Sequence, residues 1–244
     1  MKPIGIVSAL AAEARTLGAA SARGAGLLEL GDGVLLAVSG IGKVAAAAAA
    51  RRLVLAGATG LASYGMAGAL DPALICGTVV LPEALASLDG ATPAATSPAW
   101  RQHVRAALPG SCIAAAGRLL TCERPLGRDA KAAAWRSCGA IAVDMESAAI
   151  AQVAGQAGLP FIALRVIVDT AADELPAAVL AASSGGRLRI GTLIGGLLRA
   201  PGDLGALIRL SARYRIASRM LSAVAGPGTA SRHALAGGAE GAQP

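Results

Sequence analysis

The chain has 244 residues, enough to bury the core of one full domain, and its 55% hydrophobic content with 2% aromatics is typical of an Ala- and Gly-rich globular protein. Its formal charge of +7 is uneven, because seven arginines and one aspartate lie between residues 183 and 222. This concentration argues against a general nucleic-acid-binding surface and for one local basic face. The four cysteines show no CxxC or histidine pairing, so neither a zinc site nor a disulfide framework is indicated.

Short apolar strands alternate with Ala-rich helices along most of the chain. This alternation predicts an α/β three-layer sandwich with a mixed, largely parallel central sheet. Residues 10–16 are interpreted as a turn that carries Glu13, and residues 86–97 as a loop. The predicted strands cover residues 3–9, 24–33, 34–39, 61–64, 78–82, 111–121, 140–144 and 161–168, and the predicted helices cover residues 43–56, 98–108, 128–137 and 146–157.

One domain is predicted over residues 1–225, and its last part, residues 183–222, is expected to form a pair of basic amphipathic helices. A Gly-, Ala- and Ser-rich tail at residues 226–244 is predicted to be disordered. We expect no signal peptide, because no long apolar segment follows the first residues. Glycines or Pro160 interrupt the two longest uncharged runs, so neither is interpreted as a membrane span. A cytoplasmic location is therefore expected.

Carboxylates gather in the segment from residue 140 to residue 173, which is predicted to form a strand, a helix and a second strand. Asp144 and Glu146 lie where the first strand passes into the helix, and Asp169 closes the second strand, four residues after Arg165. Because the carboxyl ends of neighbouring strands in such a unit meet in one crevice, Glu146 and Asp169 should face the same pocket. The alternative is that these acids only cap helices.

A glycine cluster at Gly40 and Gly42 imitates the phosphate-binding fingerprint of dinucleotide-binding proteins. However, the next acidic residue is Asp71, too far along the chain to hold a ribose in that motif. We therefore predict no nucleotide cofactor. Tight turns here still allow the backbone to approach a ligand.

Five short motifs, taken together and in this order, resemble the nucleoside phosphorylase superfamily. They are IGIVSALAAEA, SGIGKVAAA, GMAGAL, AVDMESAAIA and RVIVD, and they span roughly residues 2–173. Within the superfamily they are most similar to the nucleosidases that cleave methylthioadenosine and S-adenosylhomocysteine. The segment VDTAADELPAAVLAA and the Arg-rich stretch after it resemble the phosphorylases associated with hopanoid biosynthesis, which are thought to remove adenine from adenosylhopane.

The resemblance implies a role for each matching residue. Asp169 corresponds to the acid that protonates N7 of the leaving adenine, and Glu13 to the residue that deprotonates the attacking water. Glu146 corresponds to the carboxylate that binds the ribose hydroxyls, and Met145 to the apolar wall under the sugar. Arg165 corresponds to an arginine beside the nucleophile, where it could equally hold phosphate. Further residues expected to line the substrate site are Met66, Ala67, Gly68, Leu126 and Val143.

Two departures from the family pattern favour a strongly apolar substrate. Met66 stands where the family usually carries a serine or threonine that contacts the nucleophile or phosphate. In the TCERPL segment, Pro125 and Leu126 stand where the nucleosidases carry an aromatic that stacks on the base.

Three hypotheses follow: cleavage of adenosylhopane, a methylthioadenosine/S-adenosylhomocysteine nucleosidase, and a catalytically silent nucleoside- or lipid-binding protein. No metal and no cofactor are expected, although phosphate could be a co-substrate, so hydrolysis and phosphorolysis both remain open. The resemblance implies a homodimer or larger homo-oligomer. The Arg-rich helices also predict peripheral contact with an anionic membrane, at its inner face.

Overall fold

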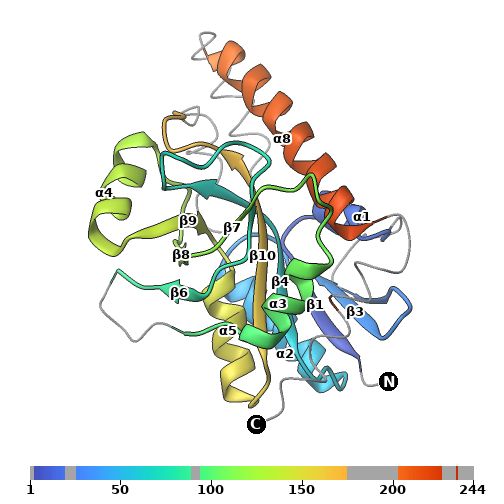
Figure 1. Ribbon diagram of the computed structural model, residues 1–244. Helices are drawn as coiled ribbons and strands as arrows, with labels where there is room; N and C mark the ends of the chain where they lie inside the picture. The colour runs from blue at the N-terminus through green and yellow to red at the C-terminus, as the bar shows by residue number, and fades with distance from the viewer. Residues whose placement is uncertain (1–2, 20–25, 89–93, 175–202, 227–234, 236–244) are drawn as a thin grey trace.

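The computed structural model describes residues 3–19, 26–88, 94–174, 203–226 and 235 (Figure 1). A mixed sheet lies at the centre, and helices cover both of its faces. The strands are β1 (Ile4–Ser8), β2 (Leu27–Glu29), β3 (Val34–Val38), β4 (Leu61–Ala69), β5 (Val79–Val80), β6 (Ala84–Ala86), β7 (Ala114–Ala115), β8 (Arg118–Thr121), β9 (Ala140–Asp144) and β10 (Phe161–Asp169). The helices are α1 (Ala11–Thr16), α2 (Lys43–Leu55), α3 (Pro98–Ala106), α4 (Arg128–Cys138), α5 (Ser147–Gln156) and α8 (Asp203–Ala225).

The sheet runs in the order β2-β3-β1-β4-β10-β5-β7, with parallel pairing from β3 through β10. Edge strand β2 pairs with β3 antiparallel, and β5 pairs with β10 antiparallel, so the sheet is mixed. A side arm of β6, β8 and β9 joins the end of β4 through antiparallel pairing of β9. The predicted α/β class with a mixed central sheet is therefore confirmed.

Strand β10 shows how side-chain alternation creates the two cores of a three-layer arrangement. Ile162, Leu164 and Val166 point into a cluster that also contains side chains of α1, α3 and α8. Phe161, Ala163 and Ile167 point into a second cluster with side chains of α2 and α5. A strand buried on both faces has to be largely apolar, and this explains the hydrophobic residues of β10 on either side of Arg165.

The structure differs from the sequence prediction in several local features: β6 was not predicted, β4 continues beyond the predicted end at residue 64, and two further differences lie at residues 10–16 and 111–121. The predicted turn at residues 10–16 contains helix α1, whose first turn is closed by the Glu13 carboxylate as it accepts a hydrogen bond from the Leu10 backbone N–H at 3.0 Å. The single strand predicted over residues 111–121 is divided into β7 and β8. Gly117 lies between them with a φ of +140°, a backbone conformation that breaks a continuous strand.

Helix α8 confirms a helix in the Arg-rich C-terminal region, but one face of it belongs to the core. Ala217, Leu221 and Val224 are buried there, and the Tyr64 hydroxyl donates a hydrogen bond to the Leu221 carbonyl at 3.0 Å. The first helix of the predicted basic pair lies outside the described residues. In the tail that was predicted to be disordered, the structure describes Gly226 and Leu235, which is buried. The other tail residues lie outside the described ranges. Among the described helices, none is long and apolar enough to span a bilayer.

Candidate active site

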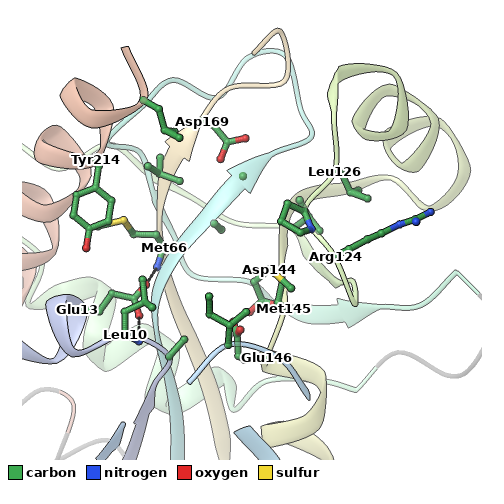
Figure 2. Close-up of a pocket in the computed structure, with 18 of the residues that line it drawn as sticks. Leu10, Glu13, Met66, Arg124, Leu126, Asp144, Met145, Glu146, Asp169 and Tyr214 are labelled. Carbon is green, nitrogen blue, oxygen red and sulfur yellow. Dashed lines mark hydrogen bonds between the residues drawn. The ribbon is translucent and has the colours of Figure 1, made fainter. Parts of the chain in front are cut away.

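A cavity of about 290 Å³ opens where β1, β4, β9 and β10 end (Figure 2). Strand ends meet here because β4 lies between β1 and β10 and also pairs with β9. The structure brings nine of the ten sequence-predicted site residues to its walls, and these are Glu13, Met66, Ala67, Gly68, Leu126, Val143, Met145, Glu146 and Asp169.

Glu13 is a buried carboxylate that several donors hold in one orientation. Its Oε2 accepts hydrogen bonds from the Ser8 hydroxyl at 3.1 Å and the Leu10 N–H at 3.0 Å, and its Oε1 accepts one from the Met66 N–H at 2.9 Å. Burial raises the pKa of Glu13, although the charge of Arg165 and these hydrogen bonds oppose the effect. A carboxylate with a raised pKa is a stronger base once ionised, so Glu13 is suited to take a proton from a nucleophile.

Asp144 and Glu146 stand two residues apart at the junction of β9 and α5 but have different surroundings. Asp144 accepts hydrogen bonds from the Thr121 hydroxyl at 2.7 Å and from the Ser147 N–H at 3.2 Å, so it does cap α5. Glu146 instead reaches across the site and accepts a hydrogen bond from the Gly42 N–H at 2.8 Å. Burial, together with the negative charge of Asp144, raises the pKa of Glu146 to about 7 despite the opposing charge of Arg165.

Arg165, the tenth predicted residue, lies behind the cavity wall and is 1% exposed. Its Nη2 forms ion pairs with Asp144 at 2.6 Å and with Glu146 at 3.8 Å. It also donates to the Ser63 hydroxyl at 2.6 Å. Burial alone would lower the pKa of Arg165, but the neighbouring carboxylates outweigh burial and raise it. Arg165 is therefore the shared counter-ion of the acids, and it does not contact the cavity itself.

Asp169 projects into the opposite end of the cavity from the end of β10 (Figure 2). It is 6% exposed and forms an ion pair with Lys131 of α4, a residue that the sequence analysis did not single out. Gly68 leaves room for the carboxylate, because a Cβ at that position would lie 3.1 Å from Asp169 Oδ2.

Apolar side chains from distant parts of the chain complete the cavity. Helix α8 contributes Leu210 and Tyr214, and Ile41 comes from the turn before α2. Figure 2 shows the Tyr214 ring beside Met66, above Glu13. Burial raises the pKa of Tyr214, and the negative charge of Glu13 adds to the effect. These three contributions to the site were not predicted from the sequence, although Tyr214 is one of only two tyrosines in the chain.

Leu126, from the loop after β8, lies on the wall opposite α8 (Figure 2), and Pro125 of the same loop also lines the cavity. A second, larger hollow of about 1020 Å³ adjoins this wall and shares Arg124 and Leu126 with the first. Leu85 and Leu120 also line it.

Solved structures of nucleosidases and of a futalosine hydrolase share this fold. A mutant of the Helicobacter pylori 5′-methylthioadenosine/S-adenosylhomocysteine nucleosidase, with 5′-methylthioadenosine in its active site, aligns with a TM-score of 0.64 at 19% identity, covering 92% of this chain and 98% of that one. The corresponding Neisseria meningitidis nucleosidase aligns with a TM-score of 0.63 at 22% identity, covering 92% and 98%. Futalosine hydrolase of Helicobacter pylori aligns with a TM-score of 0.64 at 18% identity, covering 91% and 97%.

The chain belongs to the phosphorylase superfamily, whose sequence profile matches residues 4–190. No curated protein sequence matches the chain. Membership in the superfamily, together with the shared fold, makes this protein an enzyme of the nucleoside phosphorylase and nucleosidase class.

Proposed function

We propose that this enzyme cleaves the N-glycosidic bond of an adenine nucleoside and releases adenine. The observation that carries this proposal is the grouping of Glu13, Glu146 and Asp169 in one cavity, where each carboxylate has different partners. Cleavage requires an acid at the base, an acceptor for the sugar hydroxyls and a base for the nucleophile. The three carboxylates supply one group for each requirement.

In the proposed reaction, Glu146 accepts hydrogen bonds from the ribose hydroxyls while Asp169 donates a proton to N7 of adenine. The bond between C1′ and N9 breaks, and its electron pair moves onto the base. Water attacks C1′ and gives a proton to Glu13, so adenine and the free sugar are the products. General-acid catalysis at N7 contributes about 10²–10⁴-fold, because negative charge builds on the base in the transition state.

Water is the nucleophile that the site supports best. Phosphate binding needs free cationic or hydroxyl donors beside the nucleophile, and Arg124, the exposed cation of the lining, lies on the side of the cavity away from Glu13 (Figure 2). Met66 offers only its sulfur and its backbone at the position in question, and Arg165 is already paired with Asp144 and Glu146. Glu13, in contrast, is placed to deprotonate water. Phosphorolysis, with phosphate as co-substrate, is the alternative outcome of the experiment below.

Adenosylhopane is the substrate that we favour. Leu10, Ile41, Met66 and Val168 give the cavity largely apolar walls. A volume of about 290 Å³ suits a nucleoside but not an attached polycyclic hydrocarbon. The hydrocarbon would have to leave the cavity, and the adjoining hollow beside Leu126 offers space for it, lined by apolar residues such as Leu88 and Ala94 together with polar ones such as Glu123 and Gln152. The C-terminal resemblance to hopanoid-associated phosphorylases supports the same substrate.

A methylthioadenosine/S-adenosylhomocysteine nucleosidase is the second candidate. The shared fold with enzymes of that name and the presence of Glu13 favour it. The absence of an aromatic in the TCERPL segment, where Pro125 and Leu126 line the cavity, counts against it.

Release of adenine, measured by chromatography, tests both candidates. The purified enzyme is given adenosylhopane in detergent or methylthioadenosine, each with and without phosphate. We expect phosphate-independent release from the hopanoid. Release mainly from methylthioadenosine would establish the second candidate, and dependence on phosphate would establish phosphorolysis. The absence of adenine from both substrates would contradict the proposed function.

We further propose peripheral membrane contact through the exposed face of α8, at the inner face of the membrane, by an enzyme that forms a homodimer or larger homo-oligomer. Arg209, Arg215 and Arg219 are exposed on α8, and Ile216 between them is 47% exposed. A basic helix face with an exposed apolar side chain suits an anionic lipid surface, where a hopanoid substrate would reside.

A further inference from the structure

Lys131 is a buried cation that the proposed reaction does not yet use. It lies on α4, is 1% exposed and still reaches the wall of the cavity. Lysine is almost never fully buried unless its charge is paired. Its ammonium forms an ion pair with Asp169 and donates a hydrogen bond to the Thr170 carbonyl at 2.8 Å. Other charged residues of the same helix, such as Asp129 and Arg136, are exposed.

The ion pair changes where the catalytic proton is held. A general acid must carry a proton before the bond to the base breaks, but a carboxylate in an ion pair with an ammonium carries none. The transferable proton of the pair is therefore on Lys131 Nζ. An ammonium has three N–H donors, and Asp169 and Thr170 accept two of them.

We propose that Lys131 is the proton source for the leaving base and that Asp169 passes the proton on. This inference rests on the proposed function and refines the origin of its acid. As the C1′–N9 bond breaks and its electron pair moves onto the purine, an N–H bond of Lys131 breaks and an O–H bond forms at Asp169. Asp169 in turn gives a proton to N7. Lys131 is left as a neutral amine, and after adenine leaves it regains a proton from solvent while Glu13 releases to solvent the proton that it took from water.

A purely positioning role for Lys131 makes different predictions. If only its charge mattered, any cation that reached Asp169 would orient the carboxylate equally well. Arginine keeps a positive charge and can pair with a carboxylate, but it does not lose its proton in proteins. A lysine that supplies the proton therefore cannot be replaced by arginine.

The test compares Lys131→Met and Lys131→Arg in steady-state adenine release from the substrate that the wild-type enzyme cleaves. We expect kcat to fall about 10²–10⁴-fold in both variants, the range of general-acid catalysis, with KM changed less than about threefold. Arg136→Met is the matched control, because it removes an exposed cation from the same helix, and its kcat should remain that of the wild type. An Lys131→Arg enzyme within about threefold of the wild-type kcat would overturn the proposal and leave a positioning role.

Chemical rescue keeps the proposal testable if the larger side chains disturb folding. Lys131→Ala is assayed with increasing methylamine or 2-fluoroethylamine, whose ammonium form is the stronger acid, and its thermal unfolding is compared with that of the wild type. We expect adenine release to rise with the concentration of amine and to depend on the acid strength of the amine used. No recovery with either amine would overturn the proposal. A wild-type enzyme that releases no adenine would instead overturn the proposed function, so the two failures can be told apart.

Discussion

Asp169 is the residue whose side chain the proposed chemistry needs most directly. Asp169→Asn keeps the size of the group but cannot pass a proton, so kcat for adenine release should fall about 10²–10⁴-fold. Binding of the nucleoside, measured by calorimetry, should change much less. Asp129→Asn is the control, because Asp129 is exposed on α4 and should leave turnover unchanged. A catalytically inactive binding protein would release no adenine, either as the wild type or as any of these variants.

The ionisation of Glu146 should determine how kcat/KM changes at acidic pH. Its pKa is raised to about 7, and only its ionised form accepts hydrogen bonds from both sugar hydroxyls. We expect kcat/KM to fall as the pH drops below about 7, and this fall should disappear against a lower baseline in Glu146→Gln. A profile that stays flat down to pH 5 would contradict the assignment.

The same carboxyl group makes stability depend on pH in the opposite direction. Its pKa is raised in the folded state from 4.5 to about 7, so the folded protein holds this proton more tightly than the unfolded chain does. This contribution is fully present below pH 4.5 and is lost as the pH rises through about 7. We expect Tm to decline between pH 5 and pH 8 in the wild type, and to decline less in Glu146→Gln, by differential scanning calorimetry.

At the scale of elements, β4 approaches the acids so closely that only glycine fits at position 65. A Cβ there would lie 2.6 Å from Glu13 Oε1 and 2.7 Å from Arg165 Nη1. Gly65→Ala should displace both groups, lower kcat and destabilise the fold by about 1–3 kcal/mol, the usual cost of overpacking. Gly155→Ala is the opposite control, since nothing lies within 4 Å of its added Cβ and it lies in α5. It should stabilise by up to about 1 kcal/mol in urea unfolding.

Helix α8 divides its residues between core, cavity and solvent. Leu221 is buried in the core, Tyr214 lines the cavity and Arg219 is exposed. The basic composition of this segment predicted only the solvent-facing part. The contribution of α8 to the cavity was not predictable from local sequence patterns. Tyr214 lies beside Met66 only because α8, which is distant in sequence, packs on the sheet.

At the scale of the whole molecule, the exposed face of α8 predicts association with anionic vesicles. The purified enzyme should sediment with phosphatidylglycerol vesicles at low salt and dissociate as salt screens the attraction. A triple variant in which glutamine replaces Arg209, Arg215 and Arg219 should no longer sediment with the vesicles. Its turnover of methylthioadenosine, or of the substrate solubilised in detergent, should remain that of the wild type. Equal sedimentation of wild type and triple variant would contradict membrane contact through this face.

Much of the fold was predictable because its signals are local. Apolar runs predicted β1, β10 and the first part of β4, which continues past Gly65 to Ala69, and the acid-rich junction at Asp144 and Glu146 predicted where the cavity lies. Lys131 was not predictable, because a lysine in a polar helix is typical of a solvent-exposed face. Its burial arises from the position of α4 beside the end of β10, a tertiary arrangement that short-range pattern does not encode.

The buried carboxylates and Arg165 beside the proposed sugar position should favour a positively charged ligand. Glu13, Asp144 and Glu146 surround a single buried cation, Arg165, so three ionised carboxylates against one guanidinium leave the cluster two positive charges short of balance. A neutral ribose does not supply that charge, whereas the cationic sugar that forms as the base departs does. Attraction between such charges is strong in a site shielded from water. In the proposed reaction, part of the binding energy is therefore gained only as the glycosidic bond breaks. A nucleoside mimic with a permanently cationic ring should then bind the site more tightly than the substrate does.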